Sequence, residues 1–137
     1  MIYLIITVIL WGITPVIDKI AAVNADATVA IFVRGITIAV ASTAILAASG
    51  KTALVTETSS KAILCLVVGG VLAGCLGVFT YMRAMQSVSD AGMVAVLTST
   101  YPLVALALSV ALLNEKLSLA KGVGSVLIVI GIFLLNF

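Results

Sequence analysis

Charged residues are scarce in this sequence of 137 residues: Lys and Arg number seven, Asp and Glu five, and together they make up 9%. A soluble domain carries about 25%. Histidine is absent, which removes the commonest metal ligand and proton shuttle. The net charge of +2, with no run of Lys or Arg, gives no basis for binding nucleic acid. These shortages exclude most soluble catalytic and nucleic-acid-binding classes.

Sites for covalent or metal chemistry are also missing. The two cysteines, Cys65 and Cys75, lie in one apolar stretch, so on a helix they would stand about 15 Å apart and could not form a disulfide with each other. The sequence shows no nucleophile–base pair, metal-ligand spacing or phosphate-binding loop. We therefore expect no catalytic residue, no metal site and no cofactor.

Apolar residues dominate instead, at 64% with a mean hydropathy of +1.40. Runs of roughly 20 apolar residues are typical of membrane-spanning helices. The sequence predicts an all-α membrane protein with one domain over residues 1–137, surrounded by the lipid bilayer. The first run is interpreted as a retained helix because the basic flank of a signal peptide is missing. The expected helices cover about residues 2–22, 28–48, 62–86, 91–113 and 119–137.

Short connections predict that neighbouring helices run antiparallel, so an odd number of spans places the two termini on opposite sides. Four lysines lie on the N-terminal side of the membrane, against two or three Lys and Arg on the other. This bias favours an N-terminus inside the cell, but only weakly. So small a bias is also compatible with insertion in both orientations.

Several short motifs occur in a characteristic order. Trp11-Gly12 is followed by Pro15 and Lys19, and Arg34 lies within the second apolar run. Later come Thr80-Tyr81-Met82-Arg83-Ala84-Met85, Leu97-Thr98-Ser99-Thr100-Tyr101-Pro102, Asn114-Glu115-Lys116-Leu117-Ser118, Gly122 and Gly131. Over the whole chain this order resembles the EamA-type unit of drug/metabolite transporters.

The resemblance implies one five-helix half of an inverted repeat in a multi-pass protein of the cell (inner or plasma) membrane. Such a half needs a partner of opposite orientation to form a central cavity. An antiparallel homodimer and a heterodimer with a related chain are both open. The four-helix multidrug-resistance relatives carry a proton-coupling glutamate eight residues before the first helix's lysine. Here that position is Trp11, which argues against the same coupling.

Asp18 is a charged group within the expected first helix, and Arg34 is one within the expected second helix. Both lie toward the same side of the membrane, at similar depth. Charges within spans usually face a cavity or a partner. Arg34 is therefore either a bidentate anchor for an anionic group of a substrate or a partner of Asp18 that only ties two helices together.

Two further groups are candidates for the wall of a cavity. Trp11, Thr14, Pro15 and Asp18 share one helix face, and Pro15 frees a backbone carbonyl of the preceding turn. Packing between helices is the alternative for that face. In the fourth run, the polar groups lie beside a proline, and hydrogen bonds within the helix are the alternative to cavity lining. These residues are Ser99, Thr100, Tyr101 and Pro102.

Glycines recur in two of the expected helices, Gly70 and Gly74 in the third and Gly124 and Gly131 in the fifth. Such spacing lets helix backbones approach closely. We expect these four positions to serve packing, with the last helix as the candidate dimer seam.

The sequence thus predicts a carrier or facilitator that moves a small organic metabolite by alternating access in an antiparallel dimer. An amino acid or another zwitterionic or anionic solute is the expected substrate class. Two other hypotheses stay open: a subunit of a lipid-linked sugar flippase, and a membrane scaffold subunit that transports nothing.

Overall fold

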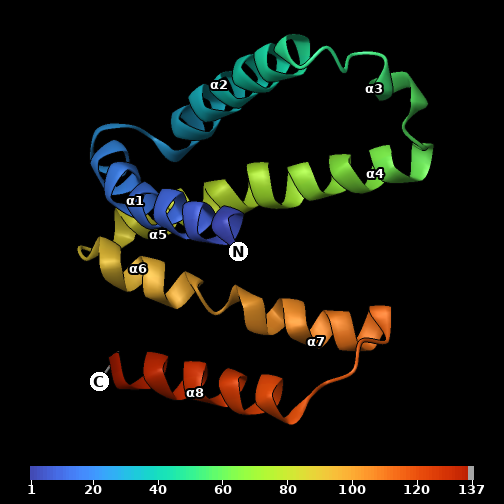
Figure 1. The fold of residues 1–137 in the computed structure, drawn as a ribbon. Coiled ribbons are helices and arrows are strands. Elements are labelled where there is room, and N and C mark those ends of the chain that lie inside the picture. Colours follow the sequence, from blue (N-terminus) through green and yellow to red (C-terminus); the bar gives the residue numbers. More distant parts are fainter. Residues whose placement is uncertain (136–137) are drawn as a thin grey trace. The chain divides into compact units, whose positions relative to one another are not determined.

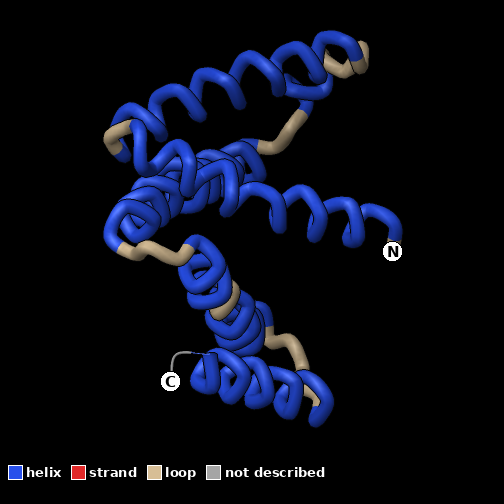
Figure 2. The backbone as a smooth tube through the Cα atoms, turned by 90° about the vertical axis from the view of Figure 1, so that its left-hand side faces the viewer, coloured by secondary structure: helices blue, strands red, loops and turns tan. Residues whose placement is uncertain are grey.

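The computed structural model describes residues 1–135, and these form helices joined by short loops, with no strand among them (Figures 1 and 2). Four helical stretches are long and apolar enough to cross a membrane. A fifth apolar helix is shorter. The all-α membrane class predicted from the sequence is confirmed.

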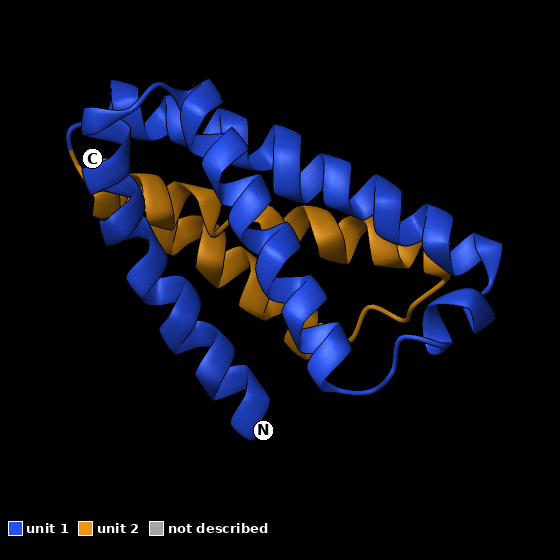
Figure 3. Ribbon diagram, turned by 90° about the horizontal axis from the view of Figure 1, so that it is seen from above, with its two compact units in different colours: residues 1–89 blue, residues 90–137 orange. Residues whose placement is uncertain are grey.

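The contacts divide the chain into two compact units, Met1–Ser89 and Asp90–Phe137, which are coloured separately in Figure 3. The first unit holds α1 (Ile2–Asn24), α2 (Ala27–Ala48), α3 (Leu54–Glu57), α4 (Ser60–Gly69), η1 (Gly70–Gly77) and α5 (Val78–Ser87). The second holds α6 (Ala91–Thr98), α7 (Tyr101–Leu113) and α8 (Leu119–Leu135). Each unit is described separately below.

Polar residues set the helix boundaries in the first unit. α1 ends at an extended Ala25, and the Asp26 carboxylate then caps α2 by accepting a hydrogen bond from the Thr28 amide at 2.8 Å. Gly50 follows α2 with a φ of 68°, a conformation that glycine adopts without strain. The polar loop expected between Lys51 and Lys61 contains the one-turn helix α3.

The third apolar run is a continuous helix from Ser60 to Ser87, and its middle is not α-helical. Residues Gly70–Gly77 form the π-helical segment η1 between α4 and α5. Three glycines in eight residues weaken the α-helix here. An unbroken α-helix over 62–86 was expected, so the wider turn of η1 is a difference that the hydropathy pattern does not show.

A small core lies where α5 packs against α1 and α2. Its buried apolar side chains are Ala22 and Ala27, on either side of the α1–α2 turn, and Met82 and Met85 of α5. Alanines at the turn let the helices approach closely, and the unbranched methionines fill the space between them. Away from this crossing the large apolar side chains of the unit are exposed, as a lipid-facing surface requires.

In the second unit, Asp90 caps α6 by accepting hydrogen bonds from the amides of Gly92 and Met93. The helix expected over 91–113 is interrupted at Ser99 and Thr100 and resumes as α7, with Pro102 in its first turn (Figure 1). Proline favours this position because its missing N–H would have no helical partner there. The break therefore lies directly before the proline, within a run that the sequence predicted as one helix.

α8 begins at Leu119, and the last two residues of the expected helix over 119–137 lie outside the described residues. Ser118 precedes it, and its hydroxyl accepts a hydrogen bond from the Lys121 amide at 3.3 Å. At 17 residues, α8 is about 26 Å long, at the lower limit for crossing a bilayer.

The π-helical segment makes a prediction about two neighbouring glycines. A Cβ atom added at Gly77 would lie 3.0 Å from the Leu72 carbonyl oxygen, whereas one at Gly74 would meet nothing within 4 Å. Gly77→Ala should therefore destabilise the protein by about 1 kcal/mol. Gly74→Ala should stabilise it by about 0.5–1 kcal/mol through better helix propensity. Thermal unfolding in detergent, followed by circular dichroism, measures both variants. Equal shifts of the midpoint temperature would contradict the clash expected at Gly77 in η1.

Candidate functional site

The polar centre of the first unit is an ion pair inside the membrane-spanning helices. Asp18, in the last third of α1, is only 1% exposed, and its Oδ1 accepts a hydrogen bond from Nη2 of Arg34 in α2. The short α1–α2 turn makes these helices neighbours, so the two residues come to similar depth. A lone carboxylate at this place would be very costly, and the guanidinium offsets that cost.

Arg34 is the more accessible partner, with 29% of its side chain exposed. A guanidinium carries five N–H donors. One of them is used on Asp18, and no second acceptor for Arg34 occurs among the described residues. The other N–H donors of Arg34 are therefore available on a partly exposed side chain, about 10 Å along α2 from its start. The Asp18 carboxylate balances the charge of the guanidinium.

Lys19 follows Asp18 and ties α1 to a different helix. Its Nζ donates to the carbonyl oxygen of Met85 at 2.6 Å and to that of Val88. Both carbonyls belong to the C-terminal end of α5, where backbone acceptors lack helical donors and the helix dipole favours a cation. Two consecutive residues of α1 thus hold α2 and α5 in place.

The surrounding side chains add weaker polar links. Gln86 donates from Nε2 to the Ala25 carbonyl oxygen at 2.9 Å, which joins α5 to the α1–α2 turn. Arg83 lies 5.5 Å from the Phe79 ring centroid and 3.9 Å from the Asp26 carboxylate. Tyr81, half-buried, is near enough to Asp18 and Arg34 to interact electrostatically with both.

Asp26 differs from Asp18 in that water solvates it. The backbone N–H of Thr28, its hydroxyl and the more distant Arg83 lower the pKa of the Asp26 carboxyl below its usual value. Each favours the charged form of the carboxyl, so the cap of α2 stays ionised at neutral pH.

The other predicted residues of α1 differ in how far they are buried. Thr14, one turn before Asp18, is half-buried, and its hydroxyl donates to the Leu10 carbonyl at 2.9 Å. Pro15 is half-buried within the unbroken α1, whereas Trp11 is 63% exposed. The structure brings Asp18 and Arg34 together and leaves Trp11 on the outside of this unit.

Ser99, Thr100, Tyr101 and Pro102 lie in the second unit, at the break between α6 and α7. Ser99 Oγ donates to the Val96 carbonyl at 2.6 Å, and Thr100 Oγ1 donates to that of Leu97 at 2.8 Å. Tyr101 is exposed, at 58%. Both hydroxyl groups therefore bond within their own turn, while the Tyr101 ring is available to other groups.

The four glycines predicted to serve packing have open surroundings. A Cβ at Gly70, Gly74, Gly124 or Gly131 would meet nothing within 4 Å among the described residues outside its own helical turns. Close packing at these four glycines therefore stays a prediction, and it would involve a surface that the described residues leave open.

Sequence reasoning assigned no contact with another helix to Lys19, Gln86 or Tyr81. Lys19 carried a usable signal, since a lysine deep enough to precede the end of a membrane helix needs an acceptor. Its acceptors are backbone carbonyls at the end of another helix, which no side-chain pattern marks.

The ion pair yields a prediction with an internal control. Asp18→Asn should destabilise the protein by about 3 kcal/mol, because it leaves the Arg34 charge without its partner inside the membrane. Asp26→Asn, which keeps the helix cap and loses only an exposed contact at 3.9 Å, should cost much less. Reversible unfolding in mixed micelles compares the two. Similar losses of stability in the two variants would show that burial does not determine how much each ion pair contributes.

The comparisons with known proteins give one result. Residues 1–137 match the model of the EamA-like transporter family. No curated protein and no solved structure matches the chain. The match covers the whole sequence and agrees with the apolar helices and with the resemblance stated above. The chain belongs to the EamA-like transporter family, whose members are multi-pass membrane transporters of the drug/metabolite type.

Proposed function

We propose that this transporter moves a small organic solute bearing a carboxylate or another anionic group, and that Arg34 is the anchor for that group. The observation that carries the proposal is a partly exposed guanidinium, within a membrane-spanning helix, that uses one N–H on a buried carboxylate and has donors to spare. Planar anionic groups bind such a fork through two parallel hydrogen bonds.

Charge balance favours an anionic or zwitterionic solute over a cation. Asp18 is almost completely covered, so it cannot offer its carboxylate to a substrate ammonium group. Lys19, whose Nζ is bonded to two backbone carbonyls, adds positive charge nearby. With Asp18, Lys19 and Arg34 counted together, the cluster has one positive charge in excess, which attracts an anion and repels a cation.

The cavity itself requires a second unit of this kind. In the proposed transporter, two antiparallel five-helix units, of the same or of a related chain, enclose the path and rock to expose it alternately to each side. Trp11, Thr14, Ser99, Thr100 and Tyr101 are the proposed lining residues beside Arg34. The proposed location is the cell membrane, and no cofactor is assigned a role.

Arg34→Lys separates recognition from folding. A lysine keeps the charge beside Asp18 but cannot make a bidentate contact. In proteoliposomes offered labelled carboxylates, organic phosphates and amino acids, uptake should fall at least roughly tenfold, which is the effect expected for one charged hydrogen bond. The unfolding midpoint should change little. The exposed Arg83→Lys is the matched control, and unchanged uptake by Arg34→Lys would remove the anchor.

The antiparallel assembly predicts where the C-terminus lies. Two reporters are fused to the C-terminus in separate experiments, one active only inside the cell and the other only outside. If the chain inserts in both orientations, the two reporters should give comparable signals. Adding two lysines to the loop at residues 51–61 should shift the balance to one side. A signal from a single side with the natural loop would exclude a homodimer of opposed copies and leave a heterodimer.

A further inference from the structure

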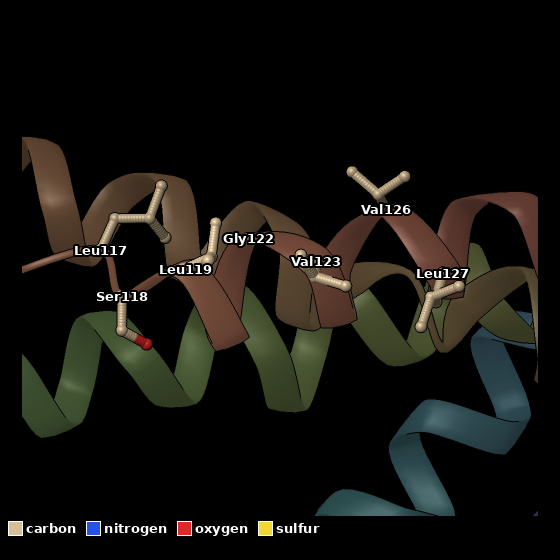
Figure 4. Close-up of a pocket in the computed structure, with 7 residues that line it drawn as sticks. All are labelled: Leu117, Ser118, Leu119, Gly122, Val123, Val126 and Leu127. Atoms are coloured by element: carbon tan, nitrogen blue, oxygen red, sulfur yellow. The ribbon is translucent and has the colours of Figure 1, made fainter.

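The second unit contains an apolar groove that the proposed transport path does not use. It lies between α7 and α8 and has a volume of about 550 Å³. Leu103, Leu106 and Val110 line one side, and Gly122, Val126 and Ile130 line the other. A second hollow beside the start of α8 shares Leu117, Gly122 and Val126 with it (Figure 4).

The groove offers no polar group to a polar solute. Its one hydroxyl-bearing residue, Ser125, donates its hydroxyl to the Lys121 carbonyl at 2.8 Å. Every other lining residue is apolar. A metabolite would lose its hydration here without compensation, so the groove suits hydrocarbon.

The length of the groove suits part of a lipid acyl chain. The lining residues extend over about 11 Å of α7 and α8 at 1.5 Å per residue. An extended hydrocarbon chain can lie along this length in contact with the apolar side chains of both helices.

The end of the groove at residues 114–118 carries cations. Leu117 lines the groove, and Lys116 precedes it in the non-helical connection. Lys121 lies in the first turn of α8, and its Nζ is 3.8 Å from the Glu115 carboxylate. No ion-pair partner for Lys116 occurs among the described residues. The connection thus has one positive charge in excess at the boundary of the hydrocarbon.

We propose that this groove is a binding site for one anionic phospholipid, with an acyl chain between α7 and α8 and its phosphate at Lys116 and Lys121. The lipid fills an apolar surface that the unit's own side chains leave open. The groove belongs to the second unit and shares no residue with the Arg34 centre of the first, so the proposal does not depend on the transport proposal.

Native mass spectrometry of the full chain, released from detergent with graded phosphatidylglycerol or phosphatidylcholine of identical acyl chains, tests the proposal. We expect one phosphatidylglycerol per chain to be retained about five- to thirtyfold more tightly than phosphatidylcholine, the range for one to two lysines at a membrane surface. The double variant Lys116→Gln, Lys121→Gln should lose the preference. The matched double variant Lys51→Gln, Lys61→Gln should keep it.

A filling substitution tests the acyl-chain part. Gly122→Leu extends into the groove with no backbone clash, since nothing lies within 4 Å of its Cβ position, and it should abolish retention of both lipids. Ile128→Phe, at an exposed position of α8 outside the groove, should not. If Gly122→Leu fails to fold, Val126→Phe fills the same groove from the next turn.

Two results would overturn the site. Equal retention of the two lipids by the natural chain would show that the lysines bind no headgroup. If Gly122→Leu instead loses a dimer while lipid retention is unchanged, the groove is a binding surface for a second copy of the chain.

Discussion

The first unit depends on pairing a charge that the membrane cannot solvate. Asp18 is buried within α1, and only a cation from another helix can compensate it. Arg34 supplies that cation, which fixes α2 against α1. The neighbouring Lys19 then bonds to the end of α5, so a single turn of α1 connects the other two helices of this crossing.

Around that crossing the apolar packing is limited to small and flexible side chains. Ala22 and Ala27 allow the close turn, and Met82 and Met85 fill the remaining volume. Most other large apolar side chains of the unit face outward. In lipid, burial of such side chains against protein has little hydrophobic driving force, so polar contacts have the larger part in fixing the helices. The ion pair and the Lys19 bonds meet that need.

Two spans depart from a regular α-helix. At the break in the fourth span the Ser99 and Thr100 hydroxyls donate to the carbonyls of Val96 and Leu97, which also accept the backbone amides of Ser99 and Thr100. In η1 the chain remains helical and the turn widens. Irregular backbone at membrane depth is tolerated where protein or a water-filled cavity surrounds it, and π-helical segments occur frequently at functional sites.

The sequence alone determined the class of protein, because the length and apolarity of the runs leave no other solvent for the chain than lipid. It also placed Arg34 and Asp18 at one depth, since a short turn between antiparallel helices sets their register. A continuous helix was expected over 91–113, and the break at Ser99 and Thr100 departs from it, because a proline within a span can lie in a kinked helix as well as in the first turn of a new one. Tertiary structure decided the rest. Whether Lys19 meets the end of α5 depends on how helices far apart in sequence cross, and backbone carbonyls leave no mark in a residue pattern. The π-helical turn at Gly70–Gly77, which contacts α2, likewise belongs to the tertiary structure, because glycines permit that geometry without dictating it.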